Sequence, residues 1–149
     1  MAVNMNNQIQ DGFYRYKIPI IETRLMGKGP GRRTALLNVE KIAKALDRPV
    51  SYLLKFVCYE IGTHFRIDKH DNNYIINGAH EPRIIQNLIF DFIEKYILCR
   101  HCGNPETTYK IKVNKKLIKC KCSACGGIFE ICSTDKLGNF IIKNHIKLR

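Results

Sequence analysis

Several features that define large protein classes are missing from this sequence of 149 residues. It has no apolar run of about eighteen residues, so no segment is expected to span a membrane. Residues 1–12 lack a charged-then-apolar targeting pattern, which predicts a cytoplasmic protein. There are no internal repeats and no low-complexity tracts. The length favours one ordinary domain or two small ones.

Side chains suited to catalysis are also scarce. The chain has 13 Asp and Glu residues, and those of its first half are too scattered to form an acid–base pair. No Ser/His/Asp or Cys/His arrangement can be assembled from the sequence. Four histidines are predicted to lie at the surface: His64, His70, His80 and His101. We therefore expect no independent catalytic site.

Cysteine, by contrast, is frequent and patterned. Two Cys-x-x-Cys pairs, Cys99/Cys102 and Cys122/Cys125, are separated by residues 103–121, a spacing typical of a structural zinc site. Four thiolate ligands leave no coordination position open, so the zinc ion is expected to hold structure and not to do chemistry. A redox-active or disulfide pair is the alternative. It is less favoured because two pairs occur at ribbon spacing and no secretory signal is visible.

The three other cysteines have separate interpretations. Cys120 lies two residues before Cys122, which leaves a slipped ligand set open, although only Cys122/Cys125 reproduces the Cys-x-x-Cys spacing. Cys58, in a helical apolar stripe, and Cys132, in an apolar run, are predicted to be small buried hydrophobic residues.

Charge is unevenly distributed along the chain. The net charge is +12. Residues 97–149 contain 11 Lys and Arg against 3 Asp and Glu, whereas residues 1–96 contain 14 against 10. A basic zinc module predicts a nearby polyanion such as ribosomal RNA, tRNA or an acidic protein face. The alternative is a solvated basic surface without a partner.

The fold class predicted is α+β: a small mixed α/β module with antiparallel strands and three helices, followed by a three-stranded zinc ribbon. We divide the chain into a flexible N-terminal segment (1–17), the α/β module (18–98) and the zinc-ribbon module (99–149). The strands expected are Ile18–Met26, Ala35–Leu37, a hairpin of Phe65–Ile67 and Tyr74–Ile76 around Asp71–Asn73, and Ile128–Cys132 and Phe140–Ile146, which finish the ribbon.

The three expected helices follow apolar periodicity. The first covers Val39–Leu46, the second begins with Pro49 in its first turn and stops at Gly62, and the third runs from about Pro82 to Leu98. The third carries the longest apolar stripe, with Ile84, Ile85, Leu88, Ile89, Phe92, Ile93, Tyr96 and Ile97. The first two raise a helix-turn-helix alternative, but the second helix is too apolar to read DNA bases.

A glycine-rich basic loop lies between the first two strands. It is formed by Gly27, Lys28, Gly29, Pro30, Gly31, Arg32, Arg33 and Thr34. A phosphate-binding P-loop needs glycine and lysine where Arg32 and Arg33 stand, and it must lead into a helix and not a strand. We therefore reject nucleotide hydrolysis by this chain. A loop that reaches a partner's phosphates, or RNA, remains open.

An arginine near the N-terminus is surrounded by aromatic residues. In the segment FYRYKIP, Phe13, Tyr14 and Tyr16 flank Arg15. The aromatic side chains could pin this short segment onto the body of the protein and leave Arg15 and Lys17 outside. A terminal strand whose arginine simply faces water is an equally good interpretation of the pattern.

Taken in order, FYRYKIP, GKGPGRRT, NVEKIAKALDRP, YIINGAHE and CRHCGNPET…CSACG resemble the amino-terminal domain of eukaryotic translation initiation factor five. The resemblance covers essentially all 149 residues. The α/β module and zinc ribbon are also shared with the beta subunit of initiation factor two. The opening VNMNNQIQDGFYRYKIP and the basic loop favour factor five.

The resemblance implies a GTPase-activating protein that acts in trans. Its partner would be the initiation-factor-two ternary complex, with its gamma GTPase subunit, GTP and initiator tRNA, on the small ribosomal subunit. Arg15 is implied to be an arginine finger that stabilises charge on the γ-phosphoryl group. Lys55 matches a family lysine, whereas Arg33 stands where the family has lysine, so a planar guanidinium replaces a point charge.

The same resemblance implies that GTP and Mg²⁺ are bound by the partner and that this chain is a monomer. Family members carry a further helical domain that is missing here, so we expect the chain to be a fragment. A second hypothesis is a non-catalytic binding module like the factor-two beta subunit. Such a module would grip a GTPase subunit, RNA or the ribosome through its basic zinc ribbon.

Overall fold

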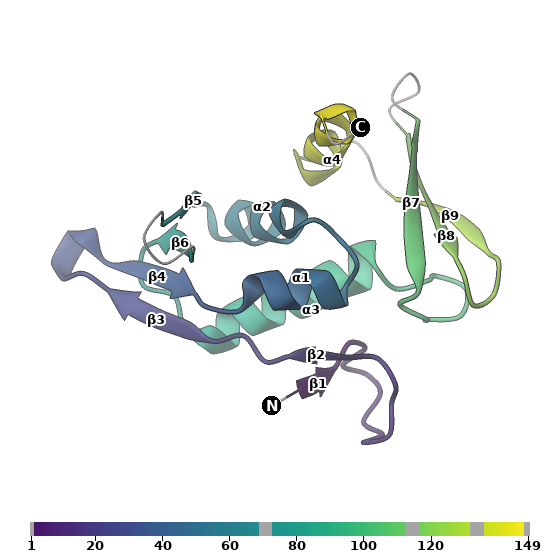
Figure 1. The fold of residues 1–149 in the computed structure, drawn as a ribbon, viewed down its shortest axis with the longest axis horizontal. Coiled ribbons are helices and arrows are strands. Elements are labelled where there is room, and N and C mark those ends of the chain that lie inside the picture. Colours follow the sequence, from purple (N-terminus) through teal and green to yellow (C-terminus); the bar gives the residue numbers. More distant parts are fainter. Residues whose placement is uncertain (1, 69–72, 113–116, 132–135, 148–149) are drawn as a thin grey trace. The chain divides into compact units, whose positions relative to one another are not determined.

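A computed structural model describes residues 2–68, 73–112, 117–131 and 136–147. Three predictions fall outside this described part: those for His70, for residues 71 and 72 of the hairpin turn, and for Cys132. The chain forms two compact units, residues 1–91 and 92–149 (Figure 1). Within the described residues, no helix combines the length and apolar character needed to cross a bilayer.

The first unit contains two antiparallel sheets. Strands β1 (Ala2–Asn4) and β2 (Lys17–Pro19) pair with each other. The larger sheet has the order β3 (Thr23–Met26), β4 (Arg33–Leu36), β6 (Tyr74–Asn77) and β5 (Phe65–Ile67). Its central strands are buried on both faces, because successive residues such as Ala35 and Leu36, or Ile75 and Ile76, are all buried.

The predicted strand over Ile18–Met26 is interrupted in the structure. Its ends form β2 and β3, and two backbone N–H groups between them are bound by side chains, while the Glu22 carbonyl accepts a hydrogen bond from Leu37 N–H at 2.9 Å. The backbone N–H of Ile21 donates to Gln86 Oε1 at 2.8 Å, and that of Glu22 donates to Asn38 Oδ1 at 2.9 Å. The chain therefore passes from the small sheet to the large one at this point.

The three helices predicted for the first module are confirmed as α1 (Val39–Ala45), α2 (Val50–Ile61) and α3 (Pro82–Tyr96). Pro49 is the residue that precedes α2, and Gly62 ends it in the left-handed conformation that favours glycine (φ 83°). From Ile85 onward the apolar stripe of α3 is buried except at Leu88, which is half-buried. The prediction was wrong for Ile84, which is 45% exposed in the first turn of the helix.

The second unit contains the ribbon, whose strands are β7 (Thr107–Lys112), β8 (Leu117–Cys122) and β9 (Ile128–Ile131), antiparallel and in that order. The hydroxyls of Thr107 and Tyr109 donate hydrogen bonds to the carbonyls of Ile97 and Tyr96 at the end of α3. These bonds attach β7 to the segment that leads into the cysteines.

The prediction of a strand over Phe140–Ile146 was wrong. These residues belong to helix α4 (Lys136–Lys147), which contacts β7 and β8. Leu137 and Ile141 are four residues apart and are both buried, as is Ile142. This spacing places them on one side of a helix, where a strand would place successive residues on opposite faces.

Candidate functional site

Four cysteine side chains converge in the second unit. The Sγ atoms of Cys99, Cys102, Cys122 and Cys125 all lie within 4.8 Å of one another. The pairs Cys99–Cys125 and Cys102–Cys122 are each separated by 3.6 Å between sulfur atoms. A tetrahedral ion with zinc–sulfur bonds of about 2.3 Å requires sulfurs about 3.8 Å apart, whereas a disulfide requires about 2 Å. The arrangement fits a four-thiolate metal site.

The two Cys-x-x-Cys turns have matching backbone geometry. Gly103 N–H donates to the carbonyl of Cys99 at 2.8 Å, and Gly126 N–H donates to that of Cys122 at 3.0 Å. Both glycines have positive φ, 75° and 73°. The neighbouring Gly127 is also constrained, because a Cβ there would lie 2.6 Å from His101 Cδ2. These glycines permit the tight turns that bring the sulfurs together.

The thiols influence one another's ionisation. Burial raises the pKa of Cys99, but backbone N–H groups of Cys102 and His101 and the neighbouring thiols outweigh it and lower the pKa to about 6. For Cys102, the backbone of Asn104 lowers the pKa, but burial and the other thiols raise it to about 12. A thiolate at Cys99 therefore forms readily and opposes ionisation of Cys102, an opposition that a bound cation would relieve.

Cys58, Cys120 and His101 lie outside the set of four sulfurs. Cys120 is fully buried on β8, opposite Tyr109 and Phe129, and it is not a member of the cluster. Cys58 is 3% exposed, which confirms it as a small buried residue. The His101 ring lies edge-on to Phe129, with centroids 6.2 Å apart, and its Nε2 is 3.4 Å from the Ile128 carbonyl.

Arg15 lies in the loop between β1 and β2, which we call the 5–16 loop. Its side chain is exposed, and its guanidinium carbon is 5.6 Å from the centre of the Tyr16 ring. Tyr14 and Tyr16 meet edge to face, with centroids 5.7 Å apart. The Tyr16 carbonyl accepts a hydrogen bond from Met5 N–H at 2.9 Å. Arg15 is thus presented to solvent beside two partly buried tyrosines.

Phe13 does not pin the segment onto the body of the protein, as the sequence had suggested it could. Its side chain is 96% exposed, whereas those of Tyr14 and Tyr16 are partly buried. Its backbone is held locally, because Phe13 N–H donates to Asp11 Oδ1 at 2.9 Å, while the ring remains at the surface. An exposed aromatic ring two residues from Arg15 is an apolar contact available to a partner.

The basic loop is anchored by Thr34. This residue is fully buried; its hydroxyl donates to the Gly78 carbonyl at 2.8 Å and accepts from His80 N–H at 3.1 Å. Gly29–Gly31 form a short 3-10 turn, η1, and Arg32 is exposed beside it. Arg33 is half-buried at the start of β4, with a buried Nε that has no hydrogen-bond acceptor among the described residues.

Lys55 lies on the half-buried side of α2. Its Nζ is 5.7 Å from the ring centres of both Tyr59 and Phe65. Two aromatic faces attract the ammonium group and limit its motion. Lys55 is thus a positioned cation near the β5 edge of the large sheet.

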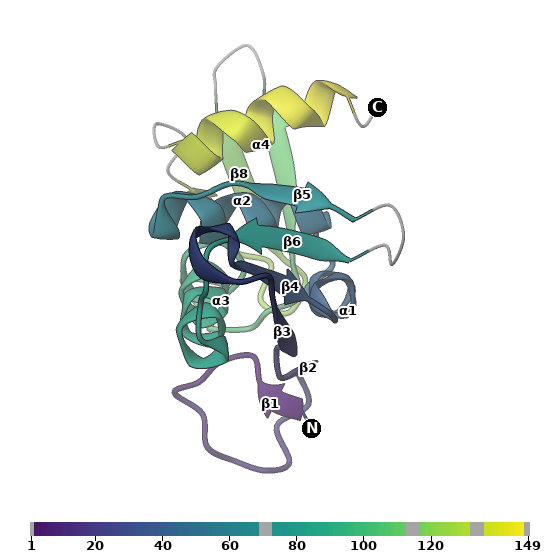
Figure 2. The same cartoon turned by 90° about the vertical axis from the view of Figure 1, so that its left-hand side faces the viewer.

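The structure does not bring Arg15, Arg33 and Lys55 into one cluster. The 5–16 loop and the turn at η1 are separated in both views of the first unit (Figures 1 and 2). Arg33 begins a central strand, whereas Lys55 contacts the edge strand β5. Arg15 is therefore separated from the basic loop, whereas Arg33 and Lys55 both lie at the large sheet.

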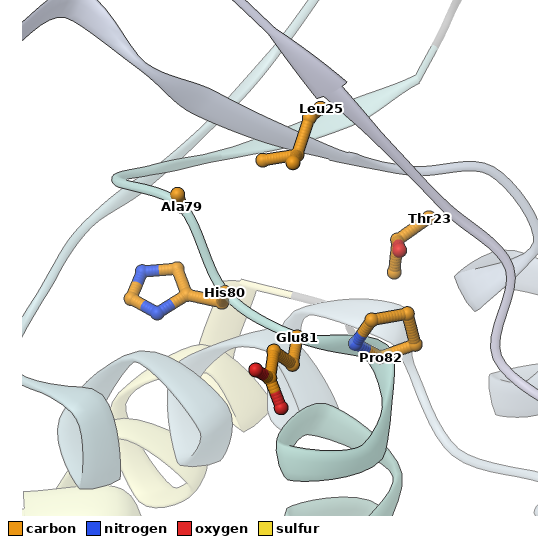
Figure 3. Close-up of a pocket in the computed structure, with 6 residues that line it drawn as sticks. All are labelled: Thr23, Leu25, Ala79, His80, Glu81 and Pro82. Carbon is orange, nitrogen blue, oxygen red and sulfur yellow. The ribbon is translucent and has the colours of Figure 1, made fainter. Parts of the chain in front are cut away.

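A shallow cleft of about 440 Å³ was not foreseen from the sequence. It is lined by Thr23, Leu25, Ala79, His80, Glu81 and Pro82 (Figure 3). The 62% exposure of Leu25 reflects this open space beside β3. Its lining comes from two segments more than fifty residues apart in sequence, which no local motif connects.

Fold and cysteine geometry together define the class of protein: a small α/β module joined to a four-cysteine ribbon. A family described as a domain found in initiation factors 2B and 5 matches residues 6–128. The chain is 43% identical to eukaryotic translation initiation factor 5 of Caenorhabditis elegans over 148 residues, covering 99% of this chain and 34% of that protein. It is 40% identical to the Saccharomyces cerevisiae protein of the same name over 144 residues, covering 97% and 35%.

A similar match is found to the "Probable eukaryotic translation initiation factor 5-2" of Arabidopsis thaliana, with 43% identity over 134 residues, 90% of this chain and 30% of that protein. The chain belongs to the family of domains found in initiation factors 2B and 5 and is a translation initiation factor domain. The resemblance to initiation factor five is confirmed. The chain spans about a third of the length of the curated relatives it matches.

Proposed function

We propose that this chain stimulates GTP hydrolysis by initiation factor two in the ternary complex on the small ribosomal subunit. The observation that carries the proposal is the exposed Arg15 on the hydrogen-bonded 5–16 loop. An arginine finger must project from its own protein to reach the nucleotide of another. Arg15 meets this requirement, because its guanidinium lies at the surface beside the Tyr16 ring.

The proposed chemistry is electrostatic. As the γ-phosphoryl group is transferred, negative charge develops on its oxygens, and a fixed guanidinium stabilises that charge. The chain needs no acid or base of its own, because GTP, Mg²⁺ and the attacking water belong to the partner. This agrees with the scattered carboxylates of the sequence.

The basic loop with Arg33, and Lys55, are proposed to support the reaction by contacts away from the 5–16 loop. Lys28 and Arg32 are exposed near η1 and can meet phosphates of RNA or of the partner's nucleotide. Lys55 is held between two rings. Since these groups lie apart from the 5–16 loop, we expect their variants to weaken binding more than the chemical step.

Zinc is the ion proposed for Cys99, Cys102, Cys122 and Cys125. Four sulfur donors at near-tetrahedral spacing favour Zn²⁺ over Mg²⁺ or Ca²⁺, which prefer oxygen. The ion would neutralise the opposed thiolates and hold the two Cys-x-x-Cys turns together. Its role is structural, since all four positions come from the protein.

A second candidate function, a non-catalytic binding module, is favoured by the outer face of the ribbon. Lys110 and Lys119 lie directly opposite each other on β7 and β8, and Lys112 and Lys121 share this face by strand alternation. Glu130 on β9 lies opposite Lys119 and offsets part of the lysine repulsion, but four lysines against one glutamate leave this face basic, which suits a polyanion. RNA is the polyanion we propose for this face.

The experiment is single-turnover GTP hydrolysis in ternary complexes bound to the small ribosomal subunit. Wild type, Arg15→Ala and Arg15→Lys are compared with Arg83→Ala, which removes an arginine from the exposed start of α3. We expect a loss of about a thousandfold for Arg15→Ala and little recovery in Arg15→Lys, because a point charge replaces the planar guanidinium. Arg83→Ala should match wild type.

Binding of each variant to the ternary complex is measured in parallel. If Arg15→Ala stimulates GTP hydrolysis as strongly as wild type does, Arg15 is not an arginine finger. The binding-module function would then be the remaining candidate. Absence of stimulation by wild type would refute the activating function of this chain.

A further inference from the structure

The 5–16 loop is closed by its own hydrogen bonds. Met5 N–H donates to the Tyr16 carbonyl at 2.9 Å and extends the pairing of β1 with β2, in which Asn4 lies opposite Lys17. On the far side of the loop, Lys17 Nζ donates to the Gly12 carbonyl at 2.7 Å. The segment that carries Arg15 is therefore connected at its base and also across its interior.

Asn4 is the main internal connection. Its single Nδ2 atom donates to two carbonyls of the loop, that of Ile9 at 2.8 Å and that of Asp11 at 3.0 Å. Both hydrogens of the amide are thus used. An aspartate of the same shape could only accept and would place its carboxylate against two carbonyl oxygens.

Asp11 transmits this restraint toward Arg15. While its carbonyl accepts from Asn4, its Oδ1 accepts from Phe13 N–H at 2.9 Å. The same carbonyl also accepts from Tyr14 N–H at 3.2 Å. The turn from Asp11 to Tyr14 is consequently defined up to the residue that precedes Arg15.

We propose that Asn4 is a positioning residue for GTPase activation, acting through the 5–16 loop to hold Arg15 in the orientation needed in the partner's site. The inference rests on the proposed function of Arg15. A finger held in one arrangement before the complex forms loses less conformational freedom when it reaches the phosphate. Asn4 itself is expected to touch neither GTP nor the partner's nucleotide pocket.

The test uses single-turnover hydrolysis in the ribosome-bound ternary complex, with Asn4→Ala, Asn4→Asp and the double variant Asn4→Ala/Arg15→Ala. The matched control is Asn7→Ala, since Asn7 is an exposed asparagine of the same loop. We expect Asn4→Ala to slow the hydrolysis step roughly tenfold or more, as two hydrogen bonds are lost. Asn4→Asp should be slower still, and Asn7→Ala should match wild type.

Coupling to Arg15 distinguishes positioning from a general structural role. If Asn4 acts only through Arg15, the double variant will be no slower than Arg15→Ala alone. Amide hydrogen exchange of the free protein is measured alongside. It should accelerate at Phe13 and Tyr14 in Asn4→Ala and stay unchanged at Ile75 and Ile76 in the large sheet, which shows that the unit remains folded.

Each result has one meaning. A large effect of Arg15→Ala with no effect of Asn4→Ala overturns the positioning role and leaves the proposed function intact. The positioning role is also overturned if Asn4→Ala slows hydrolysis by the same factor in the Arg15→Ala background as in wild type. Asn4 would then act independently of the arginine. If Arg15→Ala matches wild type, the proposed function fails, and the role of Asn4 in it fails too.

Discussion

Replacing Thr34 by valine is expected to loosen the basic loop without changing the shape of the buried side chain. Thr34 is fully buried. Its hydroxyl joins β4 to the segment before α3 by donating to the Gly78 carbonyl and accepting from His80 N–H, at 2.8 and 3.1 Å. Valine keeps the branched shape and leaves both backbone groups without this partner.

The magnitude follows from those two bonds. An intramolecular hydrogen bond contributes about 1 kcal/mol net, and more when its loss leaves a buried group unpaired. Because these backbone groups are only partly buried, we expect Thr34→Val to lower the free energy of unfolding by about 2 kcal/mol. Thr34→Ser keeps the hydroxyl and removes one buried methyl group, which should cost about 1 kcal/mol.

The assay is urea unfolding of the zinc-loaded protein, followed by far-UV circular dichroism, with hydrogen exchange at Gly78 and His80 as a local readout. Exchange at His80 should accelerate in Thr34→Val and remain slow in Thr34→Ser. A valine variant as stable as wild type, or more stable than the serine variant, would refute the assignment of the hydroxyl to this connection.

Removing the metal with a chelator should unfold the ribbon, because binding energy of a structural ion is folding energy. Hydrogen exchange of β7–β9 is expected to accelerate, whereas exchange in the large sheet should stay slow. Added zinc should restore the protection of the ribbon, and unchanged exchange in β8 would contradict a structural ion. Charge reversal of Lys110 and Lys121 should weaken RNA binding and reduce its salt dependence by about two counterions, with exposed Lys44→Glu on α1 as the control. Filter binding over a salt series checks this, and an unchanged slope would make the lysine face a solvated surface.

Features set by neighbouring residues could be predicted well from the sequence. The Cys-x-x-Cys spacing defined the four sulfurs that meet within 4.8 Å, because the geometry of each turn depends on a few consecutive residues. Helices α1, α2 and α3 followed from apolar periodicity and from Gly62 as a stop. The family could also be inferred from the sequence, because several short motifs occur in the same order as in initiation factor five.

The C-terminal helix shows where such patterns fail. A short apolar run such as Phe140–Ile142 suits a strand or a helix equally. The choice depends on the surface that it covers, and the buried faces of β7 and β8 favour a helix with Leu137 and Ile141 on one side. That surface is formed by residues distant in sequence.

The sequence alone determined which four cysteines meet, the helical periodicity and the basic character of the chain, since these depend on residue identity and local spacing. Only the tertiary structure decided that Asn4 connects the loop carrying Arg15, that Phe13 is exposed, and that Thr34 is a buried connection to Gly78. The physical reason is that a polar side chain's role depends on which backbone groups need a partner nearby. Folding places those groups, and residue identity alone does not disclose them.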